Sequence, residues 1–90
     1  MPTVRIPTVL RRHTDGASRL EAEGGTVREV FGALIEAHPG LDGSLLDGDR
    51  VPGFINVYVD DEDVRYLDGL DTVVPAGAEI SIMPAVAGGA

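Results

Sequence analysis

Residues 26–37 have the sequence Thr-Val-Arg-Glu-Val-Phe-Gly-Ala-Leu-Ile-Glu-Ala, and they predict an amphipathic helix. Thr26 and Glu29 match a capping box, in which the threonine side chain caps the helix and the glutamate reaches back to it. His38-Pro39-Gly40 predicts the end of the helix. The apolar residues recur at intervals of three and four, which places them on one buried face: Val27, Val30, Phe31, Leu34 and Ile35.

Two strands are expected before this helix. Residues 3–10 are rich in β-branched side chains, although Pro7 cannot donate to a strand ladder and predicts a bulge or an unpaired stretch. Residues 18–23 alternate polar and apolar side chains. The turn signal at 14–16, Thr-Asp-Gly, lies between these runs and predicts a hairpin.

Three further strands are expected after the helix. Residues 40–53 read as a loop, and residues 54–59 as a strong strand. A charged turn at 60–63 leads to a short strand at 64–67, a loop follows, and residues 79–83 form the last strand. The side chains expected to face the core are Ile55, Val57, Val59, Ile80 and Ile82.

This order of elements predicts an α+β domain with one main helix packed on a mixed sheet. A hairpin, a helix and a returning strand in succession favour a β-grasp, the ubiquitin-like roll. We expect the domain to span residues 1–83, and residues 84–90 to form a flexible C-terminal tail that ends in Gly-Gly-Ala.

The chain is strongly acidic, with a formal net charge of −8 over 90 residues. Residues 1–45 hold five arginines and six acids, whereas residues 46–90 hold two arginines and nine acids. Nucleic acid is a poor candidate partner, because binding to phosphates needs a basic surface. No apolar run is long enough to cross a bilayer and no signal peptide is present, so we expect a cytoplasmic protein without membrane contact.

Nothing in the sequence predicts an enzyme or a metal site. The chain has no cysteine and no lysine, which excludes a thiolate metal site and a Schiff base. His13 and His38 lie far apart and match no catalytic pattern. The carboxylates of residues 60–63 do not have the spacing of a calcium loop, so a solvated turn is the better interpretation. We therefore expect no catalytic residue, no metal and no cofactor of its own.

The unusual feature is the end of the chain. A strand runs directly into Pro84, then small residues, then Gly88 and Gly89. Val86, Ala87 and Gly88 have side chains small enough to thread a narrow channel, since glycine has no Cβ to clash. From Pro84 to Gly89 the chain reaches about 20 Å when extended. This length suits delivery of a terminal carboxylate into the active site of another protein.

This ending resembles the tail of the ubiquitin-like sulfur carriers of the ThiS/MoaD family, and nearly the whole chain shares the resemblance. Four segments are similar to the branch of the family called CysO: residues 6–11, 56–59, 61–65 and 83–89. The motifs are short, but their order and spacing together are specific.

The resemblance implies a carrier rather than an enzyme. An adenylating enzyme of the ubiquitin-activating type (MoeB/ThiF-like) would use ATP to convert the carboxylate of Gly89 to an acyl-adenylate. A sulfur donor would then displace AMP and leave a thiocarboxylate. In the CysO branch the acceptor resembles a pyridoxal-phosphate cysteine synthase, in cysteine biosynthesis, and a JAMM-type zinc metalloprotease releases the product.

One departure from the family pattern is Ala90, which follows the second glycine. Three explanations are open: a protease removes Ala90 from Gly89, Ala90 was added during cloning, or the activating enzyme tolerates alanine. The steric bulk of its Cβ makes the third the weakest. Our hypothesis is that the chain that carries Ala90 is an inactive precursor.

The expected docking surface lies beside the tail. Phe54 and Tyr58 should face away from the core, with Met83 on the neighbouring strand on the same side, unless the loop at 40–53 covers them. Other functions remain open. The chain could be the small subunit of molybdopterin synthase, a sulfur donor for a specialised metabolite, a modifier conjugated to proteins, or a non-covalent ubiquitin-like interaction module.

Overall fold

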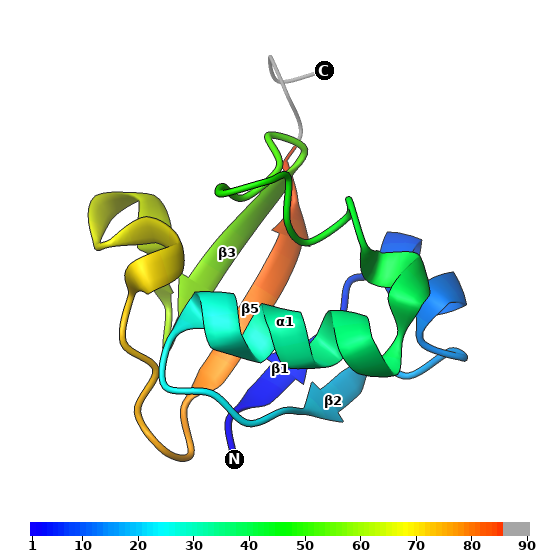
Figure 1. Ribbon diagram of the computed structural model, residues 1–90, viewed down its shortest axis with the longest axis horizontal. Helices are drawn as coiled ribbons and strands as arrows, with labels where there is room; N and C mark the ends of the chain where they lie inside the picture. The colour runs from blue at the N-terminus through cyan, green and yellow to red at the C-terminus, as the bar shows by residue number, and fades with distance from the viewer. Residues whose placement is uncertain (86–90) are drawn as a thin grey trace.

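The computed structural model describes residues 1–85, and in this part of the chain one α-helix packs across a five-stranded sheet (Figure 1). The sheet order is β2-β1-β5-β3-β4, with β1 and β5 parallel and the other neighbours antiparallel. The elements are β1 (Thr3–Arg5), β2 (Arg19–Glu21), α1 (Val27–Ala37), β3 (Ile55–Val59), β4 (Glu62–Asp63) and β5 (Glu79–Pro84). The expected β-grasp with one helix on a mixed sheet is confirmed.

The first hairpin is confirmed, but its first strand is shorter than expected. β1 pairs with β2 from Thr3↔Glu21 to Arg5↔Arg19. The expectation of a strand over residues 3–10 is wrong beyond this point, because the 3-10 helix η1 (Thr8–His13) follows Pro7. Proline has a fixed φ and no N–H group, so the strand pairing ends near Pro7, where the sequence predicted a bulge or an unpaired stretch.

The start and end of α1 follow the sequence signals closely. The Thr26 side chain accepts a hydrogen bond from Glu29 N at 3.2 Å. The Glu29 carboxylate accepts from Gly25 N at 2.7 Å, one residue earlier than a standard capping box requires. The helix ends before His38, as expected. Four of the five residues on the expected apolar face are buried, whereas Ile35 is only partly buried.

The second hairpin, between β3 and β4, turns through Asp60 and Asp61. Both have positive φ, 48° and 72°, as a two-residue hairpin turn that matches the strand twist requires. The charged turn expected at residues 60–63 is therefore confirmed for Asp60 and Asp61 only, because Glu62 and Asp63 form β4. The short strand expected at residues 64–67 is wrong, because Val64–Tyr66 forms the 3-10 helix η3. The Asp63 side chain caps this turn by accepting from Arg65 N at 2.9 Å.

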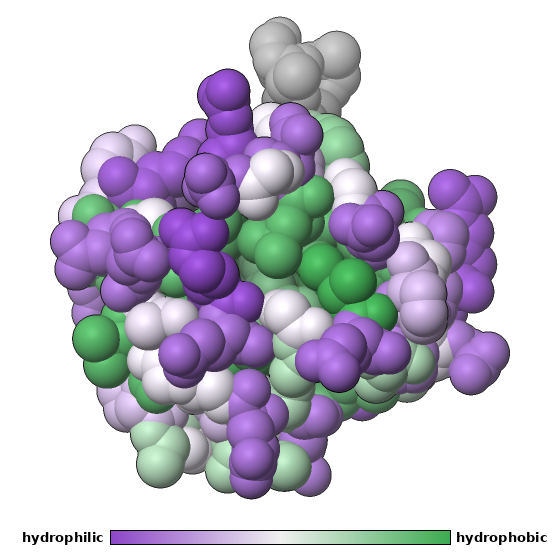
Figure 2. All heavy atoms as spheres, in the orientation of Figure 1, coloured by the Kyte–Doolittle hydropathy of each residue, from purple (hydrophilic) through white to green (hydrophobic). Residues whose placement is uncertain are grey.

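The core lies between α1 and the inner face of the sheet. The five strand residues expected to face inward are all buried. Leu41 and Leu45, from the segment after the helix, are fully buried and close one end of the core. Figure 2 shows the side of the molecule that carries α1, where hydrophilic side chains surround an apolar patch between the helix and the loop that follows it.

β5 connects the domain to the tail. The strand runs through Pro84, which pairs with Ile55, and Ala85 N donates to Phe54 O at 2.8 Å. The paired backbone thus extends two residues beyond the domain end expected at residue 83. Of the expected tail, Pro84 and Ala85 belong to this ladder, and residues 86–90 lie outside the described residues.

A first prediction concerns the close approach of Gly24 to the first turn of α1. A Cβ at Gly24 would lie 2.6 Å from Val30 N and 2.9 Å from Glu29 C, both backbone atoms of the helix. We expect Gly24→Ala to lower the free energy of unfolding by about 1–3 kcal/mol, because the helix must shift. Urea unfolding followed by circular dichroism measures the change.

The matched control is Gly32→Ala, inside α1, where a Cβ would meet no atom within 4 Å. We expect this variant to raise the free energy of unfolding by about 0.5–1 kcal/mol, because alanine has the better helix propensity. Equal effects of the two substitutions would contradict the steric explanation for Gly24.

A second prediction concerns Asp63. Its carboxylate accepts from Arg65 Nη2 at 2.7 Å and is only 9% exposed. The hydrogen bonds from Arg65 hold the pKa of Asp63 below its ordinary value of 3.8. The charged carboxylate therefore stabilises the fold above pH 3.8, and this contribution is lost as the pH falls through the lowered pKa.

We expect Asp63→Ala to lower the free energy of unfolding at pH 7 by about 1 kcal/mol, because the cap of η3 and the ion pair are both lost. At a second, acidic pH the difference between wild type and variant should be smaller, because the wild-type carboxyl becomes protonated as the pH falls through its lowered pKa. Thermal unfolding at the two pH values tests this expectation. A difference that stays constant with pH would contradict the role given to the carboxylate charge.

Candidate functional site

The site candidate is the base of the tail, at the end of β5. β5 lies between β1 and β3; both strands pair with it as far as Ser81, and β3 alone pairs with the backbone that leads into the tail. The last described contact is the hydrogen bond from Ala85 N to Phe54 O, which ties the tail to the residue before β3. Val86, Ala87, Gly88, Gly89 and Ala90, the expected threading, reactive and processing residues, lie outside the described residues.

The three residues expected to form a docking surface share the sheet face opposite α1. Asn56 pairs with Met83 and Tyr58 pairs with Ser81 across β3 and β5, so the expected parity is correct. Phe54 is 54% exposed and Met83 is 51% exposed, whereas Tyr58 is partly buried. The loop at 40–53 therefore leaves Phe54 and Met83 open to solvent. Their role in docking stays a prediction.

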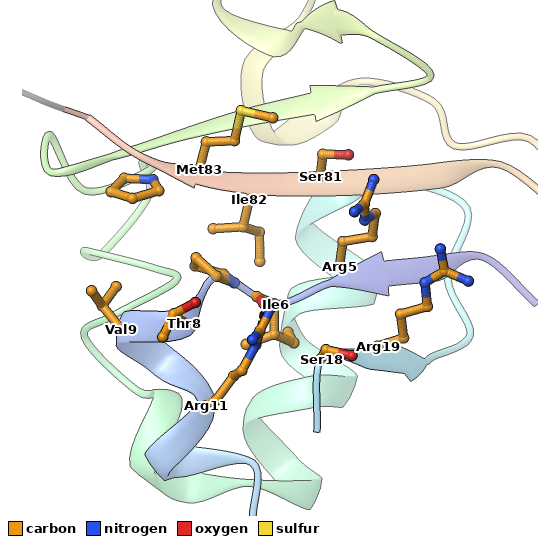
Figure 3. Close-up of a pocket in the computed structure, with 12 residues that line it drawn as sticks. Arg5, Ile6, Thr8, Val9, Arg11, Ser18, Arg19, Ser81, Ile82 and Met83 are labelled. Atoms are coloured by element: carbon orange, nitrogen blue, oxygen red, sulfur yellow. Dashed lines mark hydrogen bonds between the residues drawn. The ribbon is translucent and has the colours of Figure 1, made fainter. Parts of the chain in front are cut away.

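Sequence reasoning missed a fourth apolar residue here. Val9 is 57% exposed and lies with Met83 on the lining of a groove of about 730 Å³ (Figure 3). The groove forms because the chain turns away into η1 after β1, while β5 continues. Pro7 was the sequence signal that the strand could not continue. Because residues 3–10 were nevertheless predicted as one strand, the position of Val9 could not be predicted.

The groove and the apolar residues make this edge of the sheet suited to binding another protein. Large apolar side chains that remain exposed beside one another are typical of contact surfaces. Within residues 1–85, no three histidine, aspartate or glutamate side chains lie close enough to hold a metal ion. In the same part of the chain, no helix has the length and apolar character that crossing a membrane requires.

Comparison with known proteins places the chain in a family. The ThiS family model matches residues 4–89. The chain is 44% identical over 91 residues to the protein named sulfur carrier protein CysO from Mycobacterium tuberculosis, and the match covers 97% of each chain.

Two solved structures are also similar. The CysO chain in the Amycolatopsis orientalis BexX/CysO complex has a TM-score of 0.92 at 45% identity, over 98% of this chain and 99% of that one. The crystal structure of Mycobacterium tuberculosis CysO, described as an antigen, has a TM-score of 0.89 at 39% identity, over 96% and 100% of the two chains.

The family match covers nearly the whole chain, so the protein belongs to the ThiS family. Within it, the chain is a ubiquitin-like β-grasp protein and a homologue of CysO. The resemblance to the ThiS/MoaD family, and to its CysO branch, is thereby confirmed.

Proposed function

We propose that this protein is a sulfur carrier that acts as a protein cosubstrate rather than as a catalyst. The observation that carries the proposal is the family match over residues 4–89, which includes the diglycine and ends on Gly89. Similarity over nearly the full length to a protein named sulfur carrier protein CysO supports the same function.

The proposed chemistry takes place on Gly89. An activating enzyme binds the tail, and a carboxylate oxygen of Gly89 attacks the α-phosphorus of ATP, which releases pyrophosphate. A sulfur donor then attacks the acyl carbon and expels AMP, which leaves the thiocarboxylate. Adenylation is needed because a carboxylate is a poor electrophile, whereas AMP is a good leaving group. The sulfur then travels on the chain terminus, so the carrier needs no cysteine.

A carboxylate on Gly89 requires cleavage of the bond between Gly89 and Ala90. We propose that a protease removes Ala90, and that the chain with Ala90 is a precursor. A Cβ on the reacting residue would crowd a channel built for glycine.

The proposed acceptor is a pyridoxal-phosphate cysteine synthase, followed by a JAMM-type metalloprotease that releases the product. The pyridoxal phosphate belongs to that enzyme. The complex of a CysO chain with BexX favours a second candidate, in which the carrier delivers sulfur to a different protein partner.

A third prediction tests the reactive terminus by intact mass spectrometry of three chains: full length, ending at Gly89, and lacking Gly88 to Ala90. Each is incubated with the activating enzyme, ATP and sulfide. We expect one oxygen to be replaced by sulfur only in the chain that ends at Gly89.

The other outcomes each have a clear meaning. Sulfur on the full-length chain would contradict the precursor hypothesis but not the carrier function. An unchanged mass in every sample would overturn the carrier function and favour a non-covalent interaction module. All three chains should show the same thermal unfolding, which controls for loss of the fold.

A fourth prediction concerns Met83. In the chain that ends at Gly89, we expect Met83→Glu to raise the KM for activation about tenfold, because a carboxylate cannot be buried against an apolar partner surface without a cost. The fold should persist, since the side chain is half exposed. Val73→Glu is the control, because Val73 is 68% exposed and pairs with Thr26, the N-cap of α1. The start of α1 lies away from the tail (Figure 1). Equal kinetics for wild type and Met83→Glu would remove Met83 from the docking surface.

A further inference from the structure

The groove beside the tail is basic, although the protein as a whole is acidic. Among the twelve residues that line it are Arg5, Arg11 and Arg19, and none of the twelve is an aspartate or a glutamate. Figure 3 shows that these arginines come from three different elements, β1, η1 and β2. Thr8, Ser18 and Ser81 add hydroxyl groups to the same lining.

The arginine charges are largely uncompensated within the protein. Arg5 contacts Glu79 only at 3.9 Å, and the two side chains are 56% and 43% exposed, so the pair is weak. Arg11 Nε donates to Ile6 O at 3.1 Å, which orients the guanidinium without neutralising it. Within residues 1–85, neither Arg11 nor Arg19 forms an ion pair.

A second cleft, on the α1 side of the molecule, provides the contrast. It has about 380 Å³, and three arginines and three aspartates line it: Arg28, Arg50, Arg65, Asp49, Asp68 and Asp71. Arg28 pairs there with Asp49 at 3.5 Å and with Asp71 at 3.3 Å. The cleft on the α1 side is therefore balanced internally, and the groove beside the tail is not.

Charge is also sorted along the outer face of the sheet. Glu21 and Glu79 both lie beside Thr3, at the start of β1. Arg19 and Ser81 lie beside Arg5, at its end. Because β1 and β5 run parallel, the basic end is the one toward which β5 leads into the tail. A negative group that approaches the base of the tail therefore meets the positive end of this face.

The backbone of β5 is open along the same groove. β1 pairs with β5 only as far as Ser81, so Ile82–Pro84 has a strand on the β3 side alone. The hydrogen bonds from Asp60 N to Glu79 O and from Ala85 N to Phe54 O lie at the two ends of β3, so alternation directs the peptide groups of Ile82 away from β3. The register of β1 on β5 places the Ile82 N–H against the Arg5 carbonyl, so the Ile82 carbonyl is the group left open to the groove. The next residue on that side is Pro7, which has no N–H to offer. An extended segment can donate a backbone hydrogen bond to the Ile82 carbonyl.

We propose that the groove binds an acidic segment of a partner protein in an extended conformation, alongside the base of the tail. Carboxylates of the segment would contact Arg5 and Arg19, and its backbone would lie against Ile82. The inference rests on the proposed function in one respect, that the partner is the enzyme that activates the tail. The arginines would set the orientation of docking and its rate, as charges at the rim of an interface do.

The binding step can be tested without any enzyme. Amide chemical shifts of the full chain are recorded by NMR at low salt, with hexaglutamate, with hexalysine and with inorganic phosphate as probes. We expect hexaglutamate to shift Arg5, Thr8 and Ser81, although the net charge of −8 opposes its approach. Arg19→Glu should weaken this binding at least about fivefold, and Arg50→Glu, with the same change in net charge, should not.

Each other result would overturn the proposal. Unchanged shifts in the groove with hexaglutamate would mean that it does not bind acidic peptides. Equal shifts with inorganic phosphate would mean a site for small anions, and equal losses in Arg19→Glu and Arg50→Glu would mean an effect of net charge alone.

Kinetics with the activating enzyme then separate this inference from the proposed function, and wild type and variants are all compared as chains that end at Gly89. We expect Arg19→Glu to raise KM about tenfold at low salt with little change in kcat, and Arg50→Glu to behave as wild type. Activation of the wild type with no effect of Arg19→Glu would overturn docking of the enzyme at the groove. A chain ending at Gly89 that is never activated would count against the sulfur carrier function, while the peptide titration would still decide whether the groove binds acidic segments.

Discussion

The parallel pairing of β1 with β5 is the constraint on which the rest of the structure depends. Val4 and Ile80 face each other in this pairing and are both fully buried under α1. Two strands from opposite ends of the chain thus pair in the middle of the sheet. β2 lies beyond β1 on one side, and the hairpin β3–β4 lies beyond β5 on the other (Figure 1). A parallel pair needs a long crossover connection, and α1 lies within that connection.

This arrangement explains why the tail begins from a rigid position. The last strand is central: β1 and β3 both pair with it as far as Ser81, and β3 alone pairs with it to Pro84. The hydrogen bond from Ala85 N to Phe54 O extends that support beyond Pro84. α1 covers one face of the sheet only. The other face therefore keeps Phe54, Met83 and Val9 accessible beside the point where the tail begins. A carrier needs both properties, because an enzyme must recognise the folded domain while it acts on the chain terminus.

The charge distribution adds a second level to this recognition. A net charge of −8 describes the whole chain, but arginines from β1, η1 and β2 gather beside the tail without acids among them. Nine of the fifteen acidic side chains lie in residues 46–90. An approaching partner meets the net charge, which salt screens, whereas a docked partner meets the local charge.

The sequence by itself determined the local elements, because each signal acts over a few residues. Thr26 and Glu29 cap α1, the apolar spacing buries Val27 to Leu34, and alternation directs Ile55, Val57 and Val59 inward. The short elements were harder to predict from the sequence. Residues 8–10 and 64–67 have a composition typical of strands. In the first segment Pro7 ends the pairing of β1, and in the second the Asp63 side chain caps a 3-10 turn.

The diglycine and the small residues before it could also be recognised from the sequence, because that pattern is local. Only the tertiary structure decided what surrounds the base of the tail. Val9, Arg5, Arg11 and Arg19 come from three elements, and nothing in their spacing along the chain places them beside Met83. They meet there because β1 stops two residues before Pro7 while its parallel neighbour β5 continues, and such long-range pairing is set by packing of the whole core rather than by local sequence.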